Sequence, residues 1–178
     1  MGGVNGAEAL KALYALQEKD LEIDRLRAEA ESLPEELVAL QGQVETLEER
    51  LTNLLERRAE LEREYNRHSL DIEDLSAKEK QAEEEQKRAQ SAREQTQYEN
   101  RIQQIKDRIR ELLELSTPIM EAMENLEAEI AQVEEELAAL RPRLQELLEA
   151  NRARVAELEA AIAAKVEERT AMAAAIPA

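Results

Sequence analysis

The sequence predicts an all-α protein that folds as a long antiparallel coiled-coil helical hairpin with proline kinks. Three observations lead to this expectation: apolar residues recur on seven-residue ladders, aromatic residues are almost absent, and charge is abundant. Of 178 residues, 37% are charged and 2% are aromatic, with no Trp or Phe. This composition is typical of coiled coils and unlike that of a wide globular core.

Two interleaved ladders organise the first half of the chain. Their rungs alternate three and four residues apart, which makes a narrow apolar seam that must pack against another helix. The first ladder reads Leu16, Ile23, Ala30, Leu37, Val44, Leu51, Arg58, Tyr65 and Ile72, and the second reads Leu26, Leu33, Leu40, Leu47, Leu54, Leu61, His68 and Leu75.

Residues 1–6 are Gly-rich and are expected to be a flexible N-terminus, with the coiled-coil hairpin occupying residues 7–178. Pro34 interrupts the first helix, and a kink or short break is expected there because proline removes a helical hydrogen bond and clashes with the preceding turn. Ser32 and Glu35 have the spacing of a capping box around it.

Apolar rungs disappear between residues 76 and 97 and then return two residues out of phase, which favours two helices over one. The returning ladder reads Tyr98, Ile102, Ile105, Ile109, Leu112, Ile119, Met123, Leu126, Ile130, Val133, Leu137, Leu140, Leu144 and Leu147. We expect an outgoing arm over about 7–85, a tip over about 86–95 and a returning arm over about 96–175.

A tip centred near residue 88 would bring Pro34 level with Pro142, so that two bends coincide. Pro118, with Thr117 as a possible cap, is expected to bend the returning arm further. Near the base the rungs shift to Leu148, Val155, Leu158, Ile162 and Val166. Uncovered residues there could recruit a second copy, so both a monomer and a homodimer remain open.

Charge restricts the partners. With 41 acidic against 24 basic residues the net charge is −17, which repels phosphate backbones and anionic membranes. Nucleic acid would therefore need a local basic patch or another domain. The chain has no Cys, so neither disulfides nor thiolate metal sites form within it. It shows no secretion signal and no apolar run long enough to span a membrane. The cytoplasm is therefore the expected location, and no membrane is expected among the partners.

One positive patch is a candidate site. In the expected register, Arg63, Arg67 and His68 on the outgoing arm come level with Lys106, Arg108 and Arg110 on the returning arm. This basic band would either pair internally with Glu62, Glu64, Asp107 and Glu111 or dock an acidic partner or a phosphate backbone. The tip itself offers Arg88, Arg93 and Glu94.

Nothing in the sequence indicates catalysis, and a non-enzymatic function is expected. His68 is the only histidine and occupies a core rung, where a polar residue fixes pairing register in coiled coils; a catalytic or metal role is the alternative. The run Glu83, Glu84 and Glu85 fans around a helix and is expected to be a solvated face.

Several stretches carry a family resemblance. They are Leu10, Leu13, Leu16-Gln17, Asp20, Ile23, Leu26 and Leu33-Pro34 at the start, Tyr98-Glu99-Asn100-Arg101-Ile102 with Ile105 after the tip, Ile119-Met120-Glu121-Ala122-Met123-Glu124, and Ile176-Pro177 at the end. In this order they resemble a bacterial family of C4-type zinc-ribbon proteins with an N-terminal coiled-coil hairpin.

The resemblance implies a C-terminal ribbon that holds zinc with two Cys-x-x-Cys pairs, which this chain does not contain. No cofactor is therefore expected here. Zinc is expected only if the full-length protein has the ribbon, and an engineered or proteolysed fragment is favoured over natural loss.

Three functions remain open. The resemblance implies a non-enzymatic interaction module in transcription-, RNA- or secretion-associated assemblies, with protein partners for the hairpin and nucleic acid for the missing ribbon. The second is a regulator that inserts its tip into RNA polymerase, with Glu94 as the acidic tip residue. The third is a purely structural parallel coiled-coil dimer.

Overall fold

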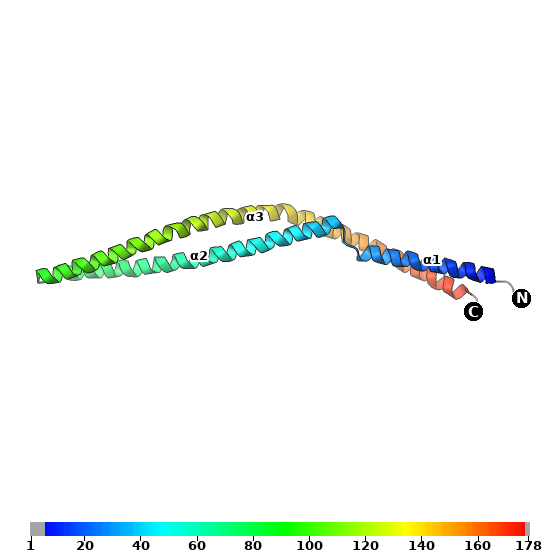
Figure 1. Cartoon of the computed structure of the whole chain (residues 1–178), viewed down its shortest axis with the longest axis horizontal. Coiled ribbons are helices and arrows are strands. Elements are labelled where there is room, and N and C mark those ends of the chain that lie inside the picture. Colours follow the sequence, from blue (N-terminus) through cyan, green and yellow to red (C-terminus); the bar gives the residue numbers. More distant parts are fainter. Residues whose placement is uncertain (1–5, 177–178) are drawn as a thin grey trace. The chain divides into compact units, whose positions relative to one another are not determined.

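A computed structural model describes residues 6–176, and these form three helices without strands (Figure 1): α1 Gly6–Glu31, α2 Glu35–Lys87 and α3 Ala92–Ala175. The expected fold class, a helical coiled-coil hairpin, is confirmed. The flexible N-terminus expected for residues 1–6 falls mainly outside the described residues; Gly6 itself begins α1.

The helices are divided between two compact units. Unit 2 comprises Thr46–Leu137, and unit 1 is the described part of Met1–Glu45 and Ala138–Ala178. In unit 2, α2 and α3 lie antiparallel on either side of a four-residue connection, as Figure 1 shows. Arg58 bonds to Glu127 and Lys106 contacts Glu79 across this pair. The parallel-dimer alternative is therefore wrong, because each seam is covered by the other arm of the same chain.

The seam of unit 2 is apolar as expected, with two unexpected rungs. Its buried apolar side chains are Leu61, Ala82, Ile102, Ile105, Leu112, Ile119, Ile130, Val133 and Leu137. Ala82 continues the second ladder seven residues beyond Leu75, and its small side chain lets the helices approach closely near the tip. Ser116 is also buried, and its hydroxyl donates to the Leu112 carbonyl at 2.8 Å, which satisfies this buried polar group.

In unit 1, α1 and the start of α2 pack on the last part of α3. Ile23, Leu37 and Val44 are buried, each on the first ladder. Cross-helix contacts join Lys19 to Glu168 and Asp20 to Arg169. The ladder residues on α3 in this unit, including Val155, Ile162 and Val166, are half-buried.

The helix break expected at Pro34 is present, because α1 ends at Glu31 and α2 begins at Glu35. The Pro34 carbonyl accepts the first α2 hydrogen bond, from Val38 N at 3.1 Å. Leu33 is in the ladder but lies in the interruption, where it is 53% exposed. The break therefore removes one rung from the seam.

The other two prolines do not interrupt a helix. Pro118 and Pro142 both lie inside α3, which is continuous through them. Thr117 does not cap a new helix as expected; its hydroxyl donates to the Leu113 carbonyl at 3.2 Å instead. Pro34 was expected to lie level with Pro142, and this is wrong. In unit 1, Ser32 contacts Arg154 and Glu36 contacts Arg143, so Pro34 lies level with a part of α3 between residues 143 and 154.

Candidate functional site

The tip is a short, well-bonded connection between α2 and α3. Residues 88–91 join the helices, and the backbone N–H groups of Arg88 and Ala89 donate to the Glu85 and Gln86 carbonyls at 3.1 Å. The Gln86 side chain spans the two helices and donates to the Gln95 carbonyl at 3.4 Å. These contacts hold the tip in one conformation.

Glu94 serves as a helix cap in this connection. Ser91 Oγ accepts from Glu94 N at 3.2 Å, while Glu94 Oε2 accepts from Gln90 N at 3.2 Å. This reciprocal arrangement is close to a capping box, which satisfies orphan donors at the start of a helix. Glu94, the acidic residue on which the RNA-polymerase hypothesis depends, thus caps the start of α3.

Both signs of charge flank this connection. Residues 83–101 contain four basic and five acidic residues, in a chain whose net charge is −17. Lys87, Arg88, Arg93 and Arg101 are all exposed. Within the part of the chain that the structure describes, none of these four has an ion-pair partner. We call Lys87, Arg88, Arg93 and Arg101 the tip cations. Arg88 and Arg93 were expected from the sequence as tip residues, whereas Lys87 and Arg101 were not.

The acidic residues near the tip cations form no ion pair with them. Glu94 is used by the cap, and Glu99 is exposed. The run Glu83, Glu84 and Glu85 precedes Lys87 on α2. The tip cations are therefore unpaired among the described residues, but they are not in excess over the carboxylates around them.

The two halves of the basic band expected below the tip, one on each arm, do not lie at the same level along the hairpin. In an antiparallel helix pair, residues at the same level have numbers with a constant sum. The contacts of Arg58 with Glu127 and of Lys106 with Glu79 both give a sum of 185. Lys106, Arg108 and Arg110 therefore lie level with residues 75–79 of α2. Seven residues separate this group from His68, which is about 10 Å of helix.

The expected register was wrong because it assumed a tip centred on residue 88. The α2 seam instead continues through Ala82, and α2 remains helical to Lys87. Lys106 contacts Glu79, Arg108 pairs with Glu111 at 3.0 Å, and Arg110 pairs with Asp107. Internal pairing, the alternative given for this half of the band, is what the structure contains.

The other half of the band lies on the outer face of α2. Arg63 and Arg67 line a shallow depression of about 480 Å³ with Glu60, Asn66 and Leu70. His68 is half-buried on its expected core rung. These residues are separate from the tip cations along α2.

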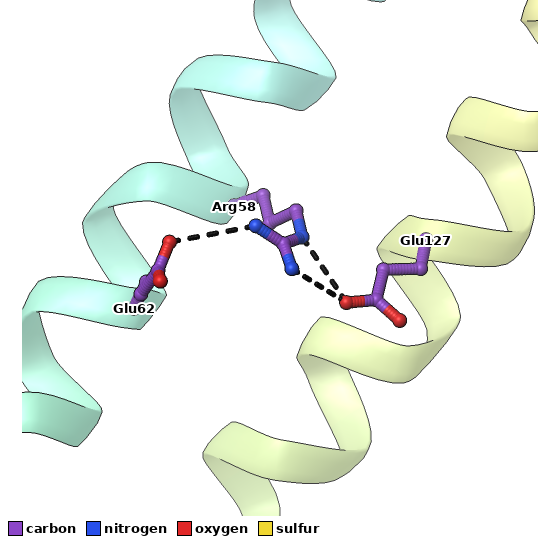
Figure 2. A network of polar contacts seen from close by, with 3 residues as sticks. All are labelled: Arg58, Glu62 and Glu127. Atoms are coloured by element: carbon purple, nitrogen blue, oxygen red, sulfur yellow. Dashed lines mark hydrogen bonds and ion pairs between the residues drawn. The ribbon is translucent and has the colours of Figure 1, made fainter.

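A polar rung interrupts the apolar seam at Arg58. Its guanidinium donates to Glu127 Oε1 at 2.6 Å and lies 3.4 Å from Glu62 Oε2, as Figure 2 shows. The hydrogen bond to Glu127 raises the pKa of Arg58 above its ordinary value, and burial opposes this only in part. The pair fixes the alignment of α2 against α3, because an Arg on a core rung requires one particular partner.

Unit 1 contains a second charged cluster, which joins α1 to α3. Lys19 Nζ lies 2.7 Å from Glu168 Oε2, and Lys165 Nζ lies 3.0 Å from Glu22 Oε2. The hydrogen bond from Lys19 lowers the pKa of Glu168 and raises that of Lys19, while the bond from Lys165 lowers the pKa of Glu22. All these shifts favour the charged forms, so the cluster stabilises the packing of α1.

Within residues 6–176, no three His, Asp or Glu side chains converge as metal ligands would. No helix in that range has a stretch both long and apolar enough to cross a membrane.

The chain was compared with known families and proteins. Residues 16–178 match the profile of the CT398-like coiled coil hairpin domain. A search of curated protein sequences found no significant match.

Two solved structures share the fold. One, from Mycobacterium smegmatis, has a TM-score of 0.77 at 24% identity, with 95% of this chain and 71% of that chain aligned. The other is the HP0958 protein from Helicobacter pylori, with a TM-score of 0.68 at 16% identity, covering 98% of this chain and 73% of the other.

Proposed function

The chain belongs to the family of CT398-like coiled coil hairpin domains, and from this premise we propose that it is a non-enzymatic interaction module whose tip binds nucleic acid through the phosphate backbone. The observation that carries the proposal is the group of four tip cations. They are exposed and unpaired among the described residues. Arg88 lies on the well-bonded connection, Lys87 and Arg93 lie in the helices beside it, and Arg101 follows in α3.

The surroundings of the tip cations favour phosphate over a protein surface. Protein interfaces have an apolar core, often with aromatic anchors. The large, strongly exposed apolar side chains of the described residues include none between Leu70 and Leu113. Binding to a phosphate backbone requires only cations and hydrogen-bond donors, and the tip adds amides from Gln90 and Gln97 to its four cations.

The acidic character of the rest of the chain is compatible with this proposal. Exposed charges more than about 8 Å apart are largely screened at physiological salt. A nucleic acid that contacts only the tip therefore interacts with the four cations and with the few carboxylates beside them, while the acidic arms limit contact elsewhere. The proposed site is confined to the tip for this reason.

The alternative of a tip that acts in RNA polymerase through an acidic residue has less support. Glu94 is the carboxylate on which it depends, and its Oε2 accepts the hydrogen bond from Gln90 N. Its main contribution is to the cap of α3. We do not carry this alternative further.

A zinc ribbon elsewhere in the full-length protein is a separate proposal that rests on the resemblance alone. Intact mass and zinc content of the protein isolated from its own cells test it. A species heavier than 20.2 kDa with one bound zinc would support the ribbon, and a match to 20.2 kDa without zinc would remove it.

The tip proposal is tested by fluorescence anisotropy with a labelled single-stranded RNA. We expect a variant with Lys87, Arg88, Arg93 and Arg101 all changed to Gln to bind at least about tenfold more weakly, because each lost cation removes a counterion-releasing contact. A matched control changes Arg25, Arg27, Arg50 and Arg152 to Gln, which are exposed and remove the same charge.

The control should bind RNA within about twofold of the native chain, since its cations lie away from the tip. Equal weakening by both variants would show that only net charge matters, and the tip proposal would fail. Absence of binding by the native chain would also overturn it and would direct the search to acidic proteins.

A further inference from the structure

Helix α1 has a second apolar face that nothing in the described chain covers. Leu10, Tyr14 and Leu21 are spaced by four and seven residues and therefore share one side of the helix. They are 68%, 65% and 52% exposed, respectively. Ile23, which is 5% exposed, faces the opposite side, so α1 is apolar on both faces.

Such a face indicates packing against another helix. A helix with one buried seam ordinarily places polar residues opposite it. Leu13, 49% exposed, extends the second apolar face on one flank. On the other flank lie the exposed charges Lys11 and Glu18, which have no ion-pair partner among residues 6–176.

We propose that this face binds α1 of a second copy of the chain in an antiparallel pair. In the alignment that places Leu10 opposite Leu21 of the second copy, Tyr14 comes opposite Gln17. Lys11 then lies within side-chain reach of Glu18 of the second copy. Two-fold symmetry repeats each of these contacts, so the pair has four opposed leucines and two opposite-charge contacts.

Charge complementarity selects this alignment. Shifting the helices by one heptad, so that Leu10 faces Ala28, brings Lys11 towards Arg25 and the two Glu18 side chains towards each other. Both contacts would then be repulsive. The flanking charges therefore favour the leucine-to-leucine alignment and disfavour the shifted one.

The interface is small, so the dimer is expected to be weak and dependent on concentration. One face of a 26-residue helix buries less than the roughly 1,200 Å² of a standard interface. The dimer should thus be observed as a reversible equilibrium between one and two chains of 20.2 kDa.

Sedimentation equilibrium of the full chain over a wide concentration range tests the proposal. We expect Lys11→Glu and Glu18→Lys each to raise the dimer dissociation constant about tenfold, since symmetry applies each repulsion twice. The double variant, and an equimolar mixture of the two single variants, should regain the native dissociation constant. Both side chains are exposed and have no ion-pair partner among the described residues, so the fold should be retained, which circular dichroism checks.

A leucine pair provides the second control. Leu10→Glu should abolish the dimer, whereas Leu70→Glu, at a residue 60% exposed in unit 2, should leave it unchanged. A native chain that stays monomeric at every concentration would overturn the proposal. So would a dimer that the charge reversals do not weaken.

Discussion

Arg154 shows how one side chain compensates for the break at Pro34. Its guanidinium donates to the Glu29 carbonyl at 2.9 Å and to the Ser32 carbonyl at 2.6 Å, and Asn151 Oδ1 orients it at 2.9 Å. The last carbonyls of a helix have no partner within it. Arg154 supplies that partner from α3 and so caps the C-terminal end of α1 within unit 1.

We expect Arg154→Met to lower the free energy of unfolding by about 1 to 3 kcal/mol, because hydrogen bonds from a charged donor are lost and two carbonyls are left with poorer partners. Urea denaturation followed by circular dichroism measures this. Arg152→Met is the matched control, since Arg152 is exposed, and should change stability by less than about 0.5 kcal/mol. Equal effects of the two variants would contradict the capping role.

Single residues were predictable from sequence where their role is local. The spacing of Ser91 and Glu94 is that of a capping box, which could have shown that Glu94 starts α3. The long-range partners of Arg58 and Arg154 could not be predicted, because they depend on the register of two helices separated by a loop. A change of a few residues at the tip changes every such partner.

At the scale of helices, the apolar ladders predicted the seams. Ile23, Leu37, Val44 and Leu61 are all buried on the outgoing ladders. The ladder signal weakened where rungs are small or polar, so Ala82 and Ser116 were missed. The connection at residues 88–91 lies within the expected tip of about 86–95. The pairing register expected from a centre at residue 88 was wrong, so the expected basic band does not form.

The charged cluster between α1 and α3 predicts a pH dependence. Glu168 and Glu22 have pKa values below the ordinary 4.5, so their stabilisation is present above that pH and is lost as the pH falls through the lowered values. Lys19 has a pKa above the ordinary 10.5, so its stabilisation is present below that pH and is lost as the pH rises through the raised value. The cluster therefore stabilises unit 1 most between these limits.

Urea denaturation as a function of pH checks this. We expect Lys19→Gln to destabilise the chain at neutral pH. The variant should also lose less stability on acidification, because Glu168 no longer has the ion pair with Lys19 that its protonation would break. Arg27→Gln removes an exposed cation from the same helix and should preserve the native profile. If Lys19→Gln lost as much stability at acid pH as the native chain, the cluster would not contribute to the pH dependence of stability.

For the whole molecule, the distribution of charge matters more than its sum. A net charge of −17 disfavours nucleic acid, and from sequence alone this directed attention to a missing domain. The hairpin places Lys87 and Arg88 at the end of α2 and just after it, and Arg93 and Arg101 on α3, on either side of one turn. Lys87 and Arg101 lie in the helices beside the turn, so the sequence of the turn alone does not reveal them.

The salt dependence of RNA binding tests the central claim most directly. Each phosphate contact on a single strand contributes a slope of about −0.7 to log K against log salt, so four tip cations predict a slope near −3 for the native chain. The four-Gln tip variant should bind with a slope close to zero. A slope that is the same in the native chain and the tip variant would show that the tip cations do not contact phosphate, and would contradict the proposed function.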